Sequence, residues 1–437
     1  MANSLIVGAI TMGMECAIVA VLSILMYLIL MWILTGNGLF SHNTYNSYAL
    51  QAESWCKGRL DLGQNYSFLE LAFYKGKYYV SFPPFPSYLL LPFALFWGSN
   101  TPDFLLLWMA DVVTVLYLYK LALSFKLSPK LSALTAVFVM LGTNVTFNML
   151  NPWVWFWAQT LCFMLAVMAV YYAYRGKGGW ALFFWACSVG CRPMQALYVP
   201  VLLVILFRKE REKFPERSFF QILWHRIYWA IPAGVVAASY MILNFLRFDD
   251  PFEFGHNYLP EFVGSEHGQF DIYYLKDNLL KLLFYPVRIK EGLTLDYPFF
   301  DGFMFYIANP LFILFFAAAA RNVLRHGVKP VRIALFAAMA VMLICLCLHK
   351  TLGGWQFGAR YTCDMLPMAL MYIINRDNAA VYKLPWIIVC LLFPFAGCMC
   401  YLTFGNLKLS RKQARKYRAI YNEHHEAMYN QKEVLAL

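Results

Sequence analysis

The stretch that decides the fold is LIVGAITMGMECAIVAVLSILMYLILMW, which runs from Leu5 to Trp32. It is longer than the apolar core of a signal peptide and long enough to cross a bilayer, so we interpret it as the first membrane helix, with no cleavable signal. The rest of the chain has the same character, with 61% hydrophobic, 18% aromatic and 14% charged residues over 437 positions. This composition predicts a multi-pass protein of the cell (plasma) membrane.

The basic residues are placed beside apolar runs. A formal net charge of +12 would fit a nucleic-acid-binding protein, but Lys and Arg cluster in short loops next to the apolar segments, which is the signal that orients membrane helices. We therefore exclude nucleic acid as a partner. Most cysteines lie inside apolar segments, where a thiol behaves as a small hydrophobic group, so neither a disulfide framework nor a metal framework is indicated.

The apolar runs predict an all-α fold with about nine full spans, a short intramembrane helical hairpin and an outer helical loop beside the membrane. The segment 82–97 is rich in proline, so we place it on the outer face and not across the bilayer. The run 180–207 has basic sequence on both sides and a helix-breaking Gly190-Cys191-Arg192-Pro193 in its middle, which predicts two short helices that turn back within the membrane. The expected full spans are residues 12–36, 103–123, 131–150, 152–174, 220–246, 303–324, 330–350, 361–375 and 384–404.

This topology gives one membrane domain, residues 1–405, and a basic C-terminal tail, residues 406–437. Two long outer loops, 37–100 and 246–302, face the same side of the membrane as the turn 350–360. The tail conflicts with the orientation rule, because it is strongly basic although the scheme places it outside.

Short elements are expected within these outer loops. In the first, an amphipathic helix should run from Ser41 to near Gly58, and a turn at residues 74–78 should join two extended pieces. In the second, we expect a polar helix at residues 273–283. The tryptophans at 153, 155 and 157 favour an interfacial aromatic belt over a sugar-binding platform.

The stretch GGWQFGARYTCDMLP, residues 353–367, carries the strongest hint of a site. It sets Arg360 and Asp364 at i, i+4 spacing where the chain re-enters lipid, which predicts a salt bridge at the bilayer boundary. Two further charges fall within predicted membrane segments: Asp111 midway along a helix and Arg192 at the hairpin apex. For Arg192 two interpretations stay open, contact with the phosphate of an anionic lipid headgroup, and structural pairing with Asp111 or a backbone carbonyl.

Several motifs, taken in order, resemble the GT-C superfamily of polyprenyl-phosphate-sugar-dependent glycosyltransferases, which includes protein O-mannosyltransferases and the lipid A aminoarabinose transferase. The resemblance covers most of the chain, from about residue 35 to 375, and no single motif is diagnostic. The motifs are GRLDL from Gly58, PPFPSYLLLP from Pro83, the Arg192-Pro193 break, NFLRFDDPFEFG from Asn244 and the stretch 353–367.

The resemblance implies that a sugar is transferred with inversion from a polyprenyl-phosphate donor to an acceptor on the outer face. The acceptor would be a cell-envelope glycan, lipid or protein. Such a reaction needs a carboxylate to take the proton of the acceptor hydroxyl. Family members place this base early in the first outer loop, but residues 41–51 contain no carboxylate. The remaining candidates are Glu70, which we place first, Asp61 and Glu53; the alternative is that all three are loop carboxylates paired with nearby Lys57, Arg59 or Lys75.

The resemblance also implies a cation that stabilises the departing phosphate. The planar fork of arginine suits phosphate oxygens, which favours Arg360 and Arg247 over Lys350, and Arg288 is a further outward cation. The candidate substrate-binding residues are Arg360, Arg247, Arg192, Lys350 and Asp364. A divalent metal stays an option because some GT-C enzymes use one, but His256 and His267 show no metal-ligand spacing.

Two other functions remain as alternatives. A lipid or solute transporter or flippase would use Asp111 and Arg192 as a relay, but such a protein is expected to have duplicated halves, and no internal repeat is found. A non-catalytic protein of GT-C fold would account for the missing early carboxylate. The sequence does not identify the donor sugar or the acceptor.

Overall fold

The computed structural model describes residues 2–36, 39–290, 295–296, 300–326 and 330–374. Within them, five helical stretches are long and apolar enough to cross a membrane, and the predicted all-α, multi-pass architecture is confirmed. The expected span 384–404 and the tail lie outside the described residues. The five stretches are α1 (Ala2–Thr35), α4 (Asp103–Ser124), α7 (Val154–Tyr174), the run Phe219–Phe248 and α16 (Pro330–Leu348).

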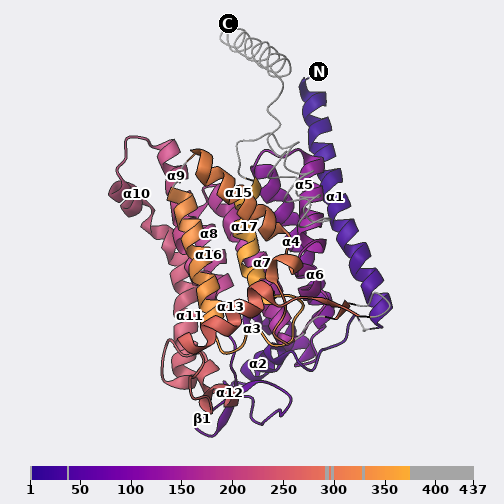
Figure 1. The fold of residues 1–437 in the computed structure, drawn as a ribbon, viewed down its shortest axis with the longest axis vertical. Helices are drawn as coiled ribbons and strands as arrows, with labels where there is room; N and C mark the ends of the chain where they lie inside the picture. Colours follow the sequence, from indigo (N-terminus) through magenta and orange to yellow (C-terminus); the bar gives the residue numbers. More distant parts are fainter. Residues whose placement is uncertain (1, 37–38, 291–294, 297–299, 327–329, 375–437) are drawn as a thin grey trace.

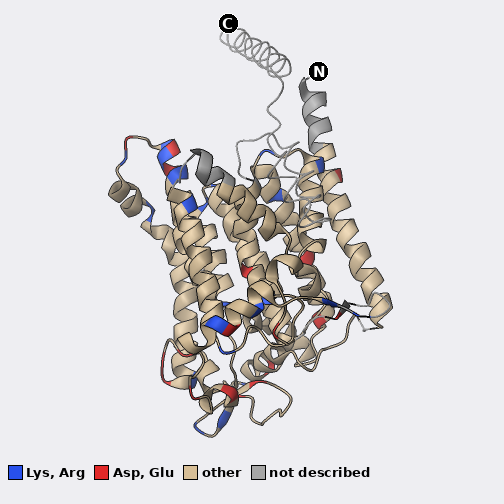
Figure 2. Ribbon diagram, viewed as in Figure 1, with Lys and Arg blue, Asp and Glu red and all other residues tan. Residues whose placement is uncertain are grey.

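The helices run between two chemically different ends (Figures 1 and 2). At one end, at the bottom of Figure 1, α2 (Ser47–Cys56), the strand β1 and α12 (Pro260–Val263) gather with the long loops; we call this end the loop face. Figure 2 shows Lys and Arg concentrated at the opposite end, around α9 (Val199–Lys213) and α5 (Pro129–Leu141), which we call the basic face. The loops predicted to share one side therefore do share one end of the bundle.

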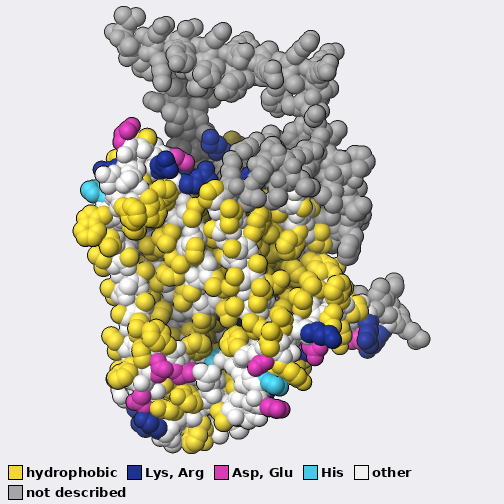
Figure 3. All heavy atoms as spheres, turned by 60° about the vertical axis from the view of Figure 1, so that its left-hand side comes forward, with side chains coloured by type: hydrophobic (Ala, Val, Ile, Leu, Met, Phe, Trp, Pro, Cys, Tyr) yellow, Lys and Arg dark blue, Asp and Glu magenta, His cyan; other side chains and the backbone are white. Residues whose placement is uncertain are grey.

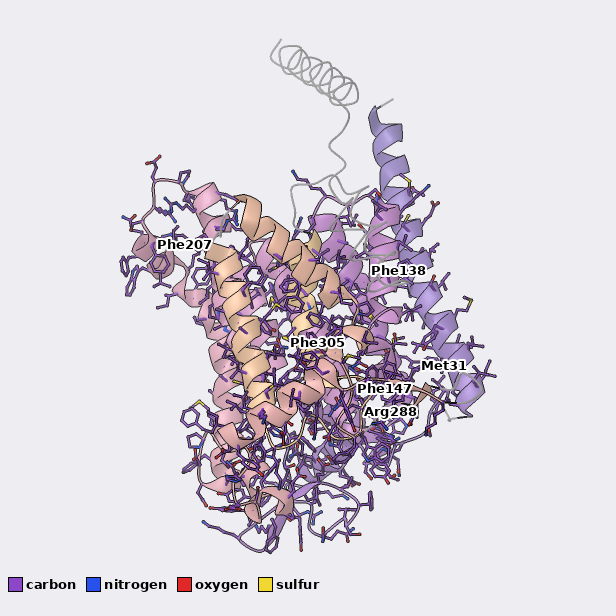
Figure 4. All side chains as sticks on the ribbon, in the orientation of Figure 1. Met31, Phe138, Phe147, Phe207, Arg288 and Phe305 are labelled. Atoms are coloured by element: carbon purple, nitrogen blue, oxygen red, sulfur yellow. The ribbon has the colours of Figure 1, made fainter. Side chains whose placement is uncertain are left out.

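Helix α7 is the centre of the bundle. Most of its side chains are buried, and it packs against α4, α8 (Gly178–Val189), α9 (Val199–Lys213) and α17 (Leu366–Ile374). In contrast, α1 lies at the periphery and exposes large apolar side chains, as expected for a lipid-facing helix. In Figure 4, Met31 of α1 lies at the outer edge of the molecule.

The predicted intramembrane hairpin is present. Helix α8 ends at Val189, the break Gly190–Arg192 and the 3₁₀ helix η1 (Pro193–Tyr198) follow, and α9 leads back. The two ends of the hairpin meet on the basic face, where a Cβ atom built on Gly176 would stand 3.2 Å from Nζ of Lys213. Arg192 therefore lies at the apex, within the bundle.

Two predicted spans are interrupted, which corrects the sequence analysis. The span expected at 131–150 is α5 (Pro129–Leu141) followed by the short α6 (Val145–Asn148). The span expected at 303–324 is α14 (Phe305–Ala308) followed by α15 (Leu311–His326). Asn309 stabilises both breaks, because its Oδ1 accepts a hydrogen bond from the amide of Asn144 at 2.7 Å and its Nδ2 donates to Thr362 at 2.9 Å. Side chains that bond to the backbone in this way compete with helical hydrogen bonds.

The first outer loop contains the predicted turn and a shorter helix than expected. Strands β1 (Leu71–Tyr74) and β2 (Lys77–Val80) pair antiparallel around Lys75 and Gly76, which both have positive φ, as a two-residue hairpin loop requires. Helix α2 begins at Ser47 and not at Ser41, because the polar residues before it bind the side chain of Asp103. The proline-rich segment forms α3 (Phe85–Trp97), which is too short to span a bilayer.

The second outer loop continues from α11 (Ala230–Phe248), which follows α10 (Phe219–Arg226) and η2 (Ile227–Trp229). The expected polar helix is present as α13 (Leu275–Phe284), preceded by η3 (His256–Tyr258) and η4 (Ile272–Tyr274) and followed by paired strands β3 (Arg288–Ile289) and β4 (Leu295–Asp296). The loop is tied to the end of α16 by a β-bridge between Phe270 and His349. The 3₁₀ helix η6 (Arg360–Met365) then leads into α17.

Candidate active site on the loop face

A cavity of about 270 Å³ lies where the hairpin apex, the outer loops and the start of α7 meet; we call it the loop-face cavity. Its volume is at the small end of the range for ligand-binding cavities, which suits a headgroup and not a whole polyprenyl lipid. Arg192 is its only lining residue that carries a permanent charge, among the described residues. The lining side chains that carry nitrogen or oxygen atoms are those of Tyr48, Trp155, Arg192, His256, Gln269, His349 and Tyr361.

Arg192 is held between a carboxylate and an aromatic ring. Its Nε lies 3.3 Å from Oδ2 of Asp364, and its Cζ lies 3.9 Å from the centre of the Tyr361 ring. The predicted pairing of Arg192 with Asp111 is therefore wrong, because Asp364 takes that place. A guanidinium carries five N–H donors and Asp364 engages one edge, so Arg192 keeps donors for an anionic ligand.

Asp364 is completely buried and its two oxygens have separate partners. Oδ2 faces Arg192, and Oδ1 accepts a hydrogen bond from Nε2 of Gln159 and contacts Sγ of Cys162. The predicted Arg360–Asp364 salt bridge is wrong. It assumed α-helical geometry, but η6 is a 3₁₀ helix with three residues per turn, in which residues four apart point in different directions.

Arg360 is almost completely buried and is held by backbone. Its Nη1 donates to the carbonyl of Trp155 at 2.9 Å, its Nη2 donates to the carbonyl of Gly353, and its Nε has no partner in the part of the chain that the structure describes. No described carboxylate lies within salt-bridge distance. A buried charge with incomplete pairing is costly, which is typical of a functional position.

Glu70 is the one predicted base that the structure brings to this site. Its Oε2 accepts a hydrogen bond from Nε1 of Trp155 at 3.0 Å, so one cavity-lining residue contacts both Glu70 and Arg360. Glu70 still reaches solvent, but the protein atoms around it desolvate the carboxylate and raise its pKa above the ordinary value. The hydrogen bond from Trp155 opposes this rise in pKa, as does the charge of Arg360, while Glu261 adds to it.

The other two predicted bases are surface carboxylates. Glu53 pairs with Lys57 one turn along α2 at 2.9 Å. Asp61 accepts a hydrogen bond from the amide of Gly63 at 2.8 Å and lies 3.8 Å from Nζ of Lys77. Neither lines the loop-face cavity. Glu53 matches the alternative of a carboxylate paired with Lys57, whereas the lysine near Asp61 is Lys77, which that alternative did not include.

The other predicted cations do not line the cavity. Arg247 is buried, with Nη1 donating to the carbonyl of Val80 and Nη2 to Oδ1 of Asn244, both structural contacts. Lys350 donates to the carbonyl of Glu261 at 2.6 Å at the surface. Arg288 is exposed on β3 and is labelled in Figure 4.

Two histidines of the cavity were missed as site residues. His256 shares a hydrogen bond between Nδ1 and the carbonyl of Ser81 at 2.7 Å, and since a carbonyl only accepts, Nδ1 carries the proton and Nε2 is an acceptor. His349 has hydrogen-bonding partners at both ring nitrogens: its Nδ1 lies 2.7 Å from the carbonyl oxygen and 3.1 Å from the amide nitrogen of Thr351, and its Nε2 lies 3.0 Å from Nε2 of Gln269. Burial lowers the pKa of both histidines to about 4, so both are neutral at physiological pH. His267 instead stacks on Tyr273 at the surface.

Asp103 anchors the early part of the first outer loop, which has no carboxylate of its own. This buried side chain, at the start of α4, accepts hydrogen bonds from the amide of Asn43 at 2.8 Å and from Nδ2 of Asn46 at 2.9 Å, and it lies 2.8 Å from Nδ1 of His42. The polar residues of this part of the loop therefore anchor it to α4. Asp111, two turns along the same helix, is equally buried, but neither of its oxygens has a described partner.

The described residues contain no group of three or more His, Cys, Asp or Glu side chains placed to hold a metal ion. A divalent metal therefore stays an untested option.

Comparisons with known proteins bear on different parts of the chain. Residues 366–406 match a family model described as Phospholipase_D-nuclease N-terminal, a short segment that lies mostly outside the described residues. No curated protein matches the chain.

Three solved structures are similar to it. ArnT from Cupriavidus metallidurans, bound to undecaprenyl phosphate, is 11% identical with a TM-score of 0.44, and the match covers 92% of this chain and 73% of ArnT. The oligosaccharyltransferase of Archaeoglobus fulgidus in its apo form is 14% identical with a TM-score of 0.39, covering 90% and 55% of the two chains. The oligosaccharyltransferase AglB of the same organism, in complex with an inhibitory peptide and a dolichol-phosphate, is 12% identical with a TM-score of 0.38. That match covers 88% of this chain and 55% of AglB.

The likeness of this chain to these three structures is a likeness of fold. At such identities and TM-scores the likeness assigns no activity to this chain, and this chain spans little more than half the length of the oligosaccharyltransferases.

Proposed function

We propose that this protein is a membrane glycosyltransferase that passes a sugar from a polyprenyl-phosphate-linked donor to an acceptor on the loop face. The observation that carries the proposal is the placement of Arg192, a guanidinium at the apex of an intramembrane hairpin that lines a headgroup-sized cavity. A fixed cation at this depth suits the phosphate of a lipid whose tail lies between helices. The motif resemblance supplies the identity of the donor class.

In this proposal Arg192 binds the phosphate and stabilises the charge that it gains as the glycosidic bond to the sugar breaks. Asp364 and Tyr361 fix the orientation of the guanidinium. Arg360 adds a second positive charge close by, so two guanidinium groups are opposed by the single buried carboxylate of Asp364. This surplus of positive charge favours an anionic ligand.

Glu70 is the proposed general base. It lies on the outer side of Trp155, where an acceptor hydroxyl would arrive from solvent, and its raised pKa makes it a stronger base than an ordinary glutamate once it is ionised. His256 has a different proposed role. Its unprotonated Nε2 accepts a hydrogen bond from a hydroxyl group of the donor sugar inside the cavity.

The test is a transfer assay with membranes that contain the protein and a panel of polyprenyl-phosphate sugars. We expect transfer of label from one donor, and we expect Glu70→Gln to lower the rate by 100-fold or more, as loss of a general base does. Glu266→Gln, an exposed carboxylate on the same face, is the matched control and should keep full activity.

Two results would contradict the proposal. Absence of transfer from every donor, with protein that is folded and membrane-inserted, would favour the non-catalytic alternative. Full activity of Glu70→Gln would remove Glu70 from the reaction, and loss of activity in His256→Gln alone would then assign the proton transfer to His256.

A further inference from the structure

A second and larger cavity, of about 620 Å³, lies on the basic face; we call it the basic-face cavity. It is formed where the start of α8, the end of α9 and the junction of α10 with α11 meet, far from the hairpin apex. Its charged lining residues are Lys177, Glu210, Lys213 and Arg226. None of them belongs to the proposed transferase site.

The cations of this cavity exceed what the protein itself neutralises. Glu210 is buried, and its Oε2 lies 2.7 Å from both Nε and Nη2 of Arg226, while its Oε1 lies 3.3 Å from Nζ of Lys213. Arg226 therefore satisfies the carboxylate, and Lys213 contributes only a long contact. Lys177 forms no ion pair within the described residues. The cavity carries a net positive charge.

The walls of the cavity place it at the depth of lipid headgroups. Trp180, Tyr228 and Trp229 line it, and such rings concentrate at the membrane interface. The adjoining helix α10 is amphipathic and exposes Phe220 and Trp224 at 76% and 78%, as a helix that lies in the interface does. In Figure 3, Lys and Arg lie along the upper edge of this side of the molecule, above a belt of hydrophobic side chains.

Two adjacent glycines shape the cavity differently. A Cβ atom built on Gly178 would stand 1.9 Å from the ring of Trp229, so this glycine allows close packing. A Cβ atom built on Gly179 would meet no atom within 4 Å, although Gly179 lines the cavity. The space beside Gly179 is therefore open, and a larger side chain there would fill it.

We propose that the basic-face cavity binds the phosphate headgroup of an anionic phospholipid from the adjacent leaflet. Lys177 and Lys213 would contact the phosphate, and the aromatic rings would pack against the glycerol and the upper acyl chains. A soluble anion would use the cations but would leave this apolar wall exposed, which favours a lipid. Basic pockets between helices at the membrane boundary recognise such headgroups.

The experiment uses the full chain in bilayer nanodiscs of phosphatidylcholine, with and without phosphatidylglycerol. We expect phosphatidylglycerol to raise the apparent melting temperature and to stay bound in native mass spectrometry. The double variant Lys177→Gln/Lys213→Gln should bind it about tenfold more weakly, since each basic side chain near a membrane contributes to lipid affinity. Arg226 stays in place, so Glu210 keeps its partner and the fold is retained.

Gly179→Leu gives an independent test, because it fills the space and leaves every charge in place. It should also weaken phosphatidylglycerol binding, while its melting temperature in phosphatidylcholine alone stays close to that of the parent protein. Lys126→Gln/Lys130→Gln is the matched control, because it removes the same charge from the same end, away from the cavity.

The proposal would be overturned if the double variant of the cavity and this control lost equal amounts of bound phosphatidylglycerol. That result would show that the lipid is attracted by the positive charge of the whole basic face and not by the cavity. The proposal would also be overturned, in favour of a soluble anion, if inorganic phosphate stabilised the protein in phosphatidylcholine nanodiscs and displaced bound phosphatidylglycerol from the nanodiscs that contain it.

Discussion

The loop face and the basic face handle charge in opposite ways. On the loop face, Asp364 and Arg192 pair within the protein, and Arg360 is enclosed by backbone carbonyls. On the basic face, most described cations are exposed, and Glu210 is the one buried charged residue among those that the structure describes there. The difference teaches that the first cavity is organised before any ligand arrives, as catalysis requires, whereas the second offers charge that a ligand would neutralise.

The largest expected effect comes from breaking the buried pair at the hairpin apex. Arg192→Met leaves the Asp364 carboxylate buried without its cation, so we expect a loss of about 3–5 kcal/mol of stability and at least 100-fold lower transfer. The double variant Arg192→Met/Asp364→Asn removes both charges. It should regain most of the lost melting temperature and none of the lost transfer.

Thermal unfolding in detergent and the transfer assay separate these two effects. Arg211→Met, an exposed arginine at the end of α9, is the control and should change neither. If the double variant regained transfer together with stability, Arg192 would be a structural residue. The loop-face cavity would then have no preorganised cation for the phosphate.

A smaller effect is expected from the two buried aspartates of α4. Asp103→Asn removes a charged acceptor that holds the first outer loop, and loss of hydrogen bonds to a charged group costs about 1.5–3 kcal/mol. Asp111→Asn removes a carboxyl group that has no described partner, so the melting temperature should stay the same or rise. A fall in melting temperature for Asp111→Asn as large as that for Asp103→Asn would contradict this contrast.

The fold could be predicted from the sequence to the extent that it depends on local pattern. Apolar run length predicted α1, α4, α7 and α16, and the Gly190-Cys191-Arg192-Pro193 break predicted the hairpin. The breaks at Asn309 and at residues 142–144 were missed, because they depend on contacts between segments far apart in the chain.

The site shows the same limit. The position of Glu70 among aromatic residues favoured it as the base, and that assignment stays a prediction. The pairing of Arg192 with Asp364 joins residues 172 positions apart, and no local spacing could indicate it. The i, i+4 argument for Arg360 failed because it assumed the wrong helix type. For His256, the one available signal was its position in an aromatic-rich outer loop, which did not distinguish it from His267.

A further expected effect is a pH dependence of stability from the neutral histidines of the loop face. The folded-state pKa of His256 is about 4, below the ordinary value of about 6.5, so the unfolded chain binds a proton first as the pH falls. Stability from this residue is complete above pH 6.5 and decreases between pH 6.5 and 4. His349 adds an effect of the same sign.

Melting temperatures between pH 7 and pH 4.5 test this. In His256→Asn the melting temperature should fall less between pH 7 and pH 4.5 than it does in the parent protein. In His225→Asn, a substitution on the basic face, the fall in melting temperature should equal that of the parent. A decrease that is identical in the parent and in His256→Asn would show that other groups, and not this buried imidazole, set the acid sensitivity.

The hydrogen bonds of Asn309 have a consequence for biogenesis. They connect the break before α6, the break after α14 and η6. The amide of Asn144 has no partner until Asn309 has been synthesised, and the side chain of Asn309 is complete in its hydrogen bonds only when Thr362 follows. Until then, α5 and α15 are incomplete membrane segments that must wait beside the translocation machinery or be shielded by earlier helices. Insertion of this protein should therefore finish in one late, concerted step and not helix by helix.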